Sequence, residues 1–189
     1  VRGLQAEVTL ATVVGKDTNA VVLRHELQQA GISAEAVIAD PSRPTTVKER
    51  FIGRAQNRHP HQMLRVDRET REPVSADIEA AMLEKILPAI ADHQAILISD
   101  YGKGVCTPRI VQQVIAAARA AHVPVIVDPR PGSDYSLYRH ATAVTPNRLE
   151  TRLATGREIR TIADAFAAGQ QLCAEVQLDH AYVTLDSDG

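Results

Sequence analysis

Short apolar runs alternate with longer helix-forming stretches from residue 75 to the end of this 189-residue chain. Ser75 precedes one of these stretches as an N-cap, and Pro108 opens the next, where proline is favoured at the first turn. Strands separated by helices predict an α/β fold with a mostly parallel sheet and right-handed crossovers. The predicted strands are residues 95–99, 125–128, 141–144 and 181–185, and the predicted helices are residues 75–90, 108–122, 148–154 and 161–176.

The start of the chain follows the same alternation. Residues 7–14 and 34–39 are predicted strands, and they flank a predicted helix over residues 18–30. Asp17 suits the N-cap of that helix, and Gly31 suits the position just after its end. The pattern therefore predicts a strand, a helix and a second strand before residue 40.

Residues 45–52 and 62–67 break the alternation. Both are strand-like and flank a polar connection, which predicts an antiparallel hairpin that projects from the sheet as a lid or arm. Lys48 and Arg50 fall on one face of this hairpin, where two neighbouring cations repel unless an anion or an acid lies between them. A phosphorylated substrate under the lid is one source of that negative charge. The alternative is a solvated strand edge that its charges protect from pairing.

The composition is that of an ordinary globular protein, with 44% hydrophobic and 23% charged residues. A net charge of -2 argues against a nucleic-acid-binding module, which usually carries a basic excess. Cys106 and Cys173 are too few and too far apart for a disulfide framework or a zinc cluster, so we expect a cytoplasmic protein. No apolar run approaches the roughly 18 residues of a membrane span. The histidines lack metal-ligand spacing, and we assign no catalytic role to any His or Cys.

Polar residues follow every predicted strand of the second half. In a parallel sheet these strand ends lie on one edge, where open α/β sheets bind their ligands, so we expect them to line one crevice. Any one of them alone suits an ordinary cap or turn, and Ser99 to Gly104 alone suits a surface turn equally well. Together they suit a phosphate and metal site. The strand ends are Asp100-Tyr101-Gly102-Lys103-Gly104, Asp128-Pro129-Arg130, Thr145-Pro146-Asn147 with Glu150, and Thr184, Asp186, Ser187 and Gly189.

Asn147 and Glu150 admit two interpretations. Three residues apart on the first turn of a helix, their side chains share a face and can hold Mg²⁺ through water. The same spacing fits an N-cap and its capping-box partner, which is the better interpretation without further context.

Several segments then carry a resemblance to a known family. In their order along the chain they resemble the ribokinase-like (PfkB) sugar kinases, and most closely the kinases of D-glycero-β-D-manno-heptose 7-phosphate. The resemblance covers essentially all of the chain. The Asn-x-x-Glu pair is shared across the superfamily, whereas the combination of Arg43–Lys48 with Asp100–Gly104 is fairly specific to the heptose kinases. The segments are Arg43–Arg50, Gln62–Asp67, Ser99–Gly104, Val127–Pro129 and Thr145–Asn147 with Glu150.

The resemblance implies a ribokinase-like three-layer sandwich with a small β lid, formed in part by residues 43–69. Residues 1–189 would be an incomplete kinase domain that uses ATP and Mg²⁺, binds a phosphorylated sugar and pairs as a homodimer through the lid, without nucleic acid or membrane. Substrate-binding residues would be Lys48, Arg50, Asp100, Lys103 and Asp128. Cofactor-binding residues would be Asn147, Glu150, Thr184, Asp186 and Gly189, with Asn147 and Glu150 holding Mg²⁺ through water.

The resemblance also implies what this segment lacks. The chain starts at Val1 and ends on a turn, which predicts an internal piece of a longer protein. The family's catalytic base would lie beyond Gly189, so we expect the 189 residues alone to be inactive. Asp186 replaces a small residue, and its charge would either weaken nucleotide binding or face solvent. The alternatives are a PfkB kinase for another sugar and a truncated relative that binds sugar phosphate without catalysis.

Overall fold

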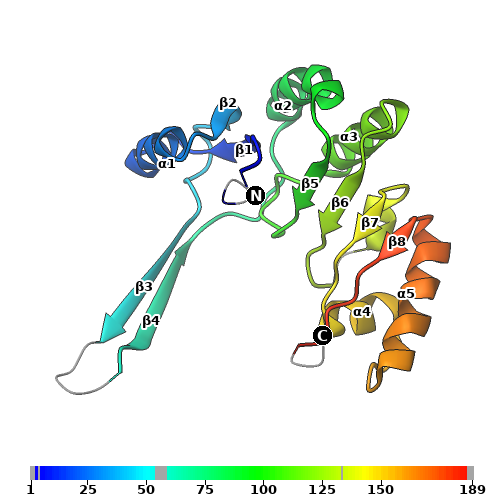
Figure 1. The fold of residues 1–189 in the computed structure, drawn as a ribbon. Helices are drawn as coiled ribbons and strands as arrows, with labels where there is room; N and C mark the ends of the chain where they lie inside the picture. Colours follow the sequence, from blue (N-terminus) through cyan, green and yellow to red (C-terminus); the bar gives the residue numbers. More distant parts are fainter. Residues whose placement is uncertain (1–2, 4, 54–58, 133, 187–189) are drawn as a thin grey trace. The chain divides into compact units, whose positions relative to one another are not determined.

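Two units make up the chain, Val1–Glu72 and Pro73–Gly189 (Figure 1). The structure is a computed structural model that describes residues 3, 5–53, 59–132 and 134–186. No helix within these described ranges is both long and apolar enough to cross a membrane. Each unit is built around secondary structure of its own.

The first unit begins with a strand, a helix and a parallel strand, as predicted. β1 (Thr9–Val14) pairs with β2 (Ser33–Ala39), and α1 (Thr18–Gln29) connects them. The Asp17 side chain accepts a hydrogen bond from the backbone N–H of Ala20 and so caps α1, while Gly31 takes the left-handed backbone with φ of 65° after its end. A small core holds the three elements together and is formed by Val14, Ala20, Leu27 and Val37.

The predicted hairpin follows in the same unit and is confirmed. β3 (Val47–Gly53) and β4 (His61–Arg68) are antiparallel, with an irregular register between Phe51 and Ile52. The connection at 54–58 lies outside the described residues. Most side chains of both strands are exposed, so the hairpin is stabilised mainly by its own ladder and its cross-strand pairs.

The second unit contains the predicted parallel sheet. Its strands β5 (Ile96–Ser99), β6 (Val125–Asp128), β7 (Ala143–Val144) and β8 (His180–Ala181) are all parallel and lie in the order of the sequence. Its α-helices are α2 (Ala76–Ala89), α3 (Pro108–Ala120), α4 (Arg148–Thr155) and α5 (Ile162–Val176), with 3₁₀ turns at η2 (Ile90–Asp92) and η3 (Tyr135–Tyr138).

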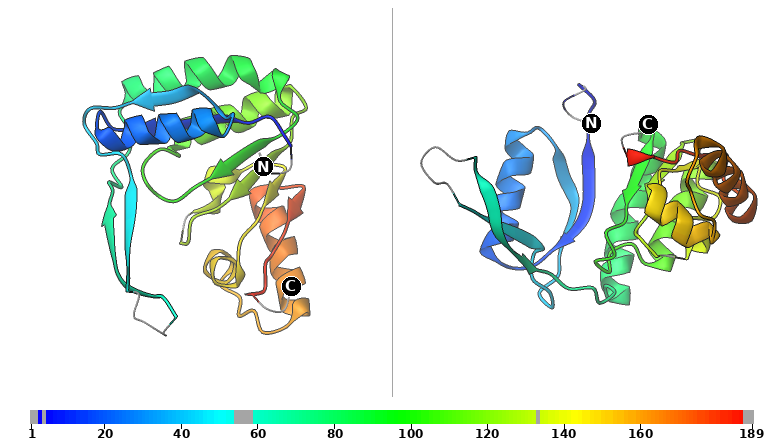
Figure 2. Two further views of the ribbon diagram at one scale, coloured as in Figure 1. Left: turned by 60° about the vertical axis from the view of Figure 1, so that its left-hand side comes forward. Right: turned by 90° about the horizontal axis from the view of Figure 1, so that it is seen from below.

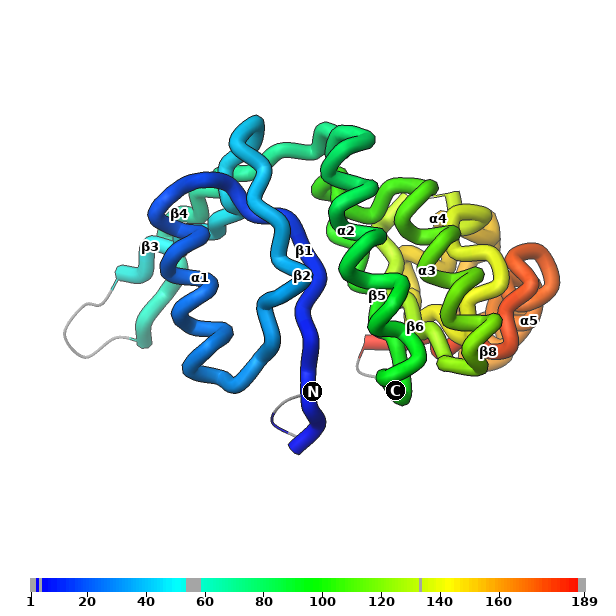
Figure 3. Tube along the Cα trace, turned by 90° about the horizontal axis from the view of Figure 1, so that it is seen from above, coloured from blue at the N-terminus to red at the C-terminus, as the bar shows by residue number. Residues whose placement is uncertain are grey.

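Helices α2 and α3 lie side by side, and α5 runs along β8 (Figures 2 and 3). Helix α3 buries a stripe that includes Val111, Ile115 and Ala118, and β6 contributes Val125 and Val127. These side chains are almost completely removed from water, which makes the packing of this unit the main source of its stability.

The predicted strand at 141–144 is limited to Ala143–Val144, and the predicted strand at 181–185 is also shorter, for a reason that lies at Pro146. Beyond β8 the chain still runs beside β7, because Tyr182 donates to the Val144 carbonyl at 2.9 Å and Thr184 to that of Pro146 at 3.0 Å. Proline has no N–H to return the bond that a parallel ladder requires. The predicted strand at 181–185 is therefore reduced to His180–Ala181 and a single bridge between Asn147 and Thr184.

Candidate functional site at the edge of the parallel sheet

The carboxyl ends of the parallel strands meet along one edge, as the sequence predicts. Ser99 pairs with Asp128 in the β5–β6 register, and the Asp100 N–H donates to the Asp128 carbonyl at 2.9 Å. Further along the same edge, Asn147 bridges to Thr184. The structure thus brings the predicted polar residues together in neighbouring pairs.

Asp100 is buried, with 5% of its surface exposed, and its carboxylate is used within the protein. One oxygen accepts the Tyr138 hydroxyl proton at 2.8 Å, and the other accepts the Gly102 N–H at 2.8 Å. The Arg130 Nε lies 3.8 Å from the first oxygen. A carboxylate with these partners fixes the loop that follows it, so Asp100 stabilises the loop from inside the fold.

The loop over residues 101–104 depends on its glycines. Gly102 and Gly104 have φ of 63° and 76°, the left-handed region that glycine enters without strain. A Cβ on Gly102 would also lie 3.2 Å from the Arg130 Cδ, tighter than ordinary packing allows. The loop therefore lies directly against Arg130 and carries Lys103, which is half-buried.

Asp128 ends β6 with its side chain exposed, and one of its oxygens accepts the Ser99 hydroxyl at 3.2 Å. It therefore remains accessible to a ligand at this edge. Cys106 lies deeper in the same region, where burial and the nearby Asp100 carboxylate raise the pKa of its thiol to about 12. A thiol that stays protonated is a poor nucleophile.

Two tyrosines behind the edge were not found by sequence reasoning. Tyr135 and Tyr138 pack edge to face with ring centroids 5.7 Å apart, and both are buried. The Tyr135 hydroxyl has no hydrogen-bond partner among the described residues, and burial together with the nearby Glu150 carboxylate raises its pKa. The available signal was their three-residue spacing after Asp134, whose side chain caps the η3 turn.

Asn147 and Glu150 form the capping box. The Asn147 side chain accepts the Glu150 N–H at 2.9 Å, and Glu150 Oε2 accepts the Asn147 N–H at 2.8 Å. Each side chain uses one oxygen in the cap. The remaining Asn147 amide nitrogen is a donor suited to a phosphate oxygen, whereas the second Glu150 oxygen is suited to a metal-bound water.

This donor set fits Mg²⁺ in one specific way. Within the described ranges, no group of three or more His, Cys, Asp or Glu side chains is arranged to hold a metal ion. Mg²⁺ commonly keeps several waters and is held by one or two carboxylates together with substrate phosphates. Glu150 can supply such a carboxylate, so the residues fit a water-mediated, nucleotide-bound ion.

A cavity of about 390 Å³ lies at this edge beside the start of α4. Its lining includes Asn147, Arg148 and Asp186. Asp186 forms an ion pair with Arg148 at 3.1 Å, and its side chain is 72% exposed, so its charge is paired while the side chain still faces solvent. Thr184 is exposed beside it, and Gly189 lies outside the described residues.

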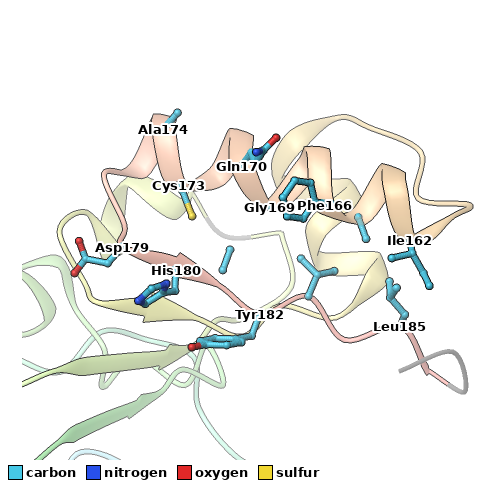
Figure 4. A pocket seen from close by; sticks show the side chains of 13 residues that line it. Ile162, Phe166, Gly169, Gln170, Cys173, Ala174, Asp179, His180, Tyr182 and Leu185 are labelled. Carbon is cyan, nitrogen blue, oxygen red and sulfur yellow. The ribbon is translucent and has the colours of Figure 1, made fainter.

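A second hollow lies away from the polar edge, between α5 and the chain that continues from β8 (Figure 4). Ile162, Phe166 and Tyr182 line it and are 71%, 68% and 59% exposed. Its lining is mainly apolar and includes none of the predicted site residues. The residues predicted to bind phosphate and metal therefore lie outside this hollow.

In the first unit, two carboxylates neutralise the positive charge of Lys48. Its ammonium lies 2.9 Å from Asp67 and 3.4 Å from Glu69, and the hydrogen bond that Lys48 donates to Asp67 raises the Lys48 pKa. Arg50 pairs directly across the hairpin with Arg65, which itself contacts Asp67 at 2.9 Å. Acidic side chains therefore lie beside Lys48. Arg50 instead faces Arg65, and a bound anion would reduce the repulsion between these two cations.

The fold and the polar edge define a ribokinase-like α/β protein. Solved structures with this fold include Arabidopsis thaliana ribokinase complexed with ribose and ATP, with a TM-score of 0.69 at 18% identity over 98% of this chain and 57% of that one. Ribokinase from Giardia lamblia gives a TM-score of 0.71 at 17% identity, over 96% of this chain and 53% of that one.

The chain belongs to the pfkB family of carbohydrate kinases, whose sequence pattern matches residues 2–189. Similar curated proteins are the bifunctional protein HldE of Geotalea uraniireducens, 40% identical over 98% of this chain, and that of Wolinella succinogenes, 40% identical over the same share. The chain spans 37% and 38% of these relatives, respectively.

Proposed function

We propose that the protein containing this chain uses ATP and Mg²⁺ to phosphorylate the anomeric hydroxyl of D-glycero-β-D-manno-heptose 7-phosphate. The product is the 1,7-bisphosphate, on the route to ADP-heptose and the lipopolysaccharide core. The observation that carries the proposal is the similarity to HldE proteins along 98% of the chain. The ordered Asp-Tyr-Gly-Lys-Gly loop at the sheet edge gives that similarity a chemical basis.

On the sugar side, we assign Lys103 and Asp128 to direct contact with the substrate. The half-buried Lys103 carries a positive charge for the phosphate, and the exposed Asp128 carboxylate accepts hydrogen bonds from sugar hydroxyls. Asp100 positions Lys103 through the Gly102 N–H. In the hairpin we assign Arg50 to the substrate phosphate, with Lys48 held beside it by Asp67 and Glu69.

On the nucleotide side, Asn147 and Glu150 lie at the start of α4, where backbone N–H groups and the helix dipole favour anions. The Asn147 amide nitrogen would donate to a phosphate oxygen, and Glu150 would hold the waters of Mg²⁺. When bound, the ion would neutralise charge on the transferring phosphoryl group. Phosphoryl transfer depends mainly on such positioning and neutralisation, which this edge supplies.

The base that removes the proton from the anomeric hydroxyl is not assigned within these residues. Following the family pattern, we place it beyond Gly189 and expect residues 1–189 by themselves to be inactive. We also propose a cytoplasmic location and a homodimer formed through the hairpin. Phe51, Met63 and Leu64 support the dimer, because they are 52%, 70% and 55% exposed on that hairpin.

The test is substrate choice by the protein expressed from its complete open reading frame. ³¹P NMR of reactions with heptose 7-phosphate, fructose 6-phosphate and ribose would identify both the preferred sugar and the phosphorylated position. We expect a 1,7-bisphosphate only with the heptose. Faster turnover of another sugar would replace this proposal with a different PfkB kinase, and binding of sugar phosphate without turnover would support a non-catalytic relative.

A further inference from the structure

Arg148 connects three segments of the second unit at the nucleotide side of the edge. Its Nε contacts Asp186 at 3.1 Å, its Nη1 donates to the Ile159 carbonyl at 2.9 Å, and its Nη2 donates to the Leu185 carbonyl at 3.2 Å. Arg148 itself is the first residue of α4. One guanidinium therefore links the start of this helix, the loop before α5 and the turn after β8.

We propose that Arg148 is a positioning residue for nucleotide binding, which fixes the turn at Leu185 and Asp186 and cancels the Asp186 charge beside the phosphates. This inference rests on the proposed kinase function. It also explains how a turn that carries an acid at this position can still serve a polyanionic ligand.

The contacts give the turn a fixed geometry. Asp186 has φ of 55°, a left-handed backbone that is uncommon outside glycine and is tolerated best by Asn and Asp. The carbonyls held by Arg148 belong to Ile159 and Leu185, whose side chains are buried in one apolar cluster. The planar guanidinium presents its donors in a rigid fork, so it holds the turn against this buried apolar cluster.

The local charges also support this role of Arg148. Asp186 and Asn147 line the same cavity, and the Asn147 N-cap is the end of α4 that favours anions. An unpaired Asp186 carboxylate there would repel a nucleotide phosphate. The Arg148 and Asp186 side chains are 27% and 72% exposed, so their ion pair adds little to stability, and its main effect is on local charge.

The test is a double-mutant cycle for binding of a fluorescent ATP analogue with Mg²⁺, in the protein expressed from its complete open reading frame. We expect Arg148→Ala to weaken binding by about tenfold, whereas Asp186→Asn alone changes it by less than about threefold. The double variant should recover part of the lost affinity, because it lacks the unpaired carboxylate although the turn is still not held by Arg148. Arg157→Ala is the control, since it removes an equal charge from a residue bonded to Gln171.

The two causes of weaker binding are separable. Arg148→Lys keeps the charge but loses the fork, so we expect it to restore only part of the affinity of the wild type. Hydrogen exchange at the Leu185 and Asp186 amides should be faster in Arg148→Ala than in the wild type, with or without nucleotide. That readout tests the fixed turn independently of any ligand.

Two results would overturn the inference. One is unchanged nucleotide affinity in Arg148→Ala, and the other is a double variant that binds as weakly as Arg148→Ala. If the wild type binds no nucleotide, the kinase proposal fails, and unchanged exchange in Arg148→Ala would then also overturn the role of Arg148 in fixing the turn.

Discussion

The hairpin of the first unit and the sheet edge of the second unit differ in how far their charged side chains are buried. On the hairpin, Lys48 and Asp67 meet at the surface with 35% and 24% of their side chains exposed. At the sheet edge, the Asp100 side chain is 2% exposed and its partners are fixed by the fold. Surface pairs adjust to solvent and ligand at little cost, whereas a buried network holds its geometry before any ligand arrives. The charges of the hairpin are therefore adaptable, whereas the geometry at the sheet edge is fixed.

The largest expected effect separates the two regions by stability. Ile115→Ala removes a side chain that is 2% exposed in the core of the second unit, and we expect it to cost about 2–5 kcal/mol of unfolding free energy. Phe51→Ala on the hairpin, where the ring is 52% exposed, should cost less than about 1 kcal/mol. Urea denaturation of both variants measures the contrast, and equal losses would show that the hairpin is packed as tightly as the sheet.

Next in size is the buried network. Asp100→Ala leaves the Tyr138 hydroxyl and the Gly102 N–H without their acceptor, and we expect it to cost about 1–3 kcal/mol. Tyr138→Phe removes only one donor and should cost about 1 kcal/mol. Thermal unfolding gives both values. A smaller loss for Asp100→Ala than for Tyr138→Phe would mean that the carboxylate does not organise the loop.

The capping box and the metal role can be separated at the start of α4. Asn147→Ala removes the cap and should cost about 0.5–2 kcal/mol. Glu150→Gln keeps an oxygen to accept the Asn147 N–H but loses the negative charge, so we expect near-normal stability and a higher Mg²⁺ requirement for turnover. Titration of activity with Mg²⁺ measures this requirement. An unchanged Mg²⁺ dependence would leave Glu150 with the cap alone.

Smallest is the pH response of the hairpin. The hydrogen bond from Lys48 lowers the Asp67 pKa below its ordinary 3.8, so the ionised carboxylate stabilises the hairpin above that value. This contribution is lost as the pH falls from 3.8 through the lowered pKa. Asp67→Asn should therefore weaken the acid sensitivity of the hairpin, measured by hydrogen exchange of the β3 and β4 amides. Identical acid sensitivity in the variant would contradict the pairing.

Much of the fold was predictable because its signals are local. Asp17 and Ser75 cap their helices through their own side chains, Pro108 opens α3, and the alternation of apolar runs with helix-forming stretches predicts the sheet. The end of the last strand was not predictable from residues 181–185, because it is set by Pro146 on the neighbouring segment. Strand ends depend on the partner as much as on the strand.

The candidate site likewise combines positions that the sequence predicts with contacts that it does not. Its residues lie at the strand ends, so the positions of Asp100, Asp128 and Asn147 at this edge were predictable from their order along the chain. Their partners lie far along the chain: Tyr138 is 38 residues from Asp100, and Asp186 is 38 residues from Arg148. Such contacts depend on the folded sheet, and no local pattern in this sequence predicts them.

The most direct test of the account compares a lysine from each region by its effect on the KM for heptose 7-phosphate. Lys103→Met at the sheet edge should raise that KM by about tenfold or more, because it removes a preorganised charge. Lys48→Met should raise it by less than about threefold, since Asp67 and Glu69 already neutralise Lys48. Lys85→Met on α2 serves as the control, being an exposed lysine outside both regions. A larger effect for Lys48→Met than for Lys103→Met would contradict the account.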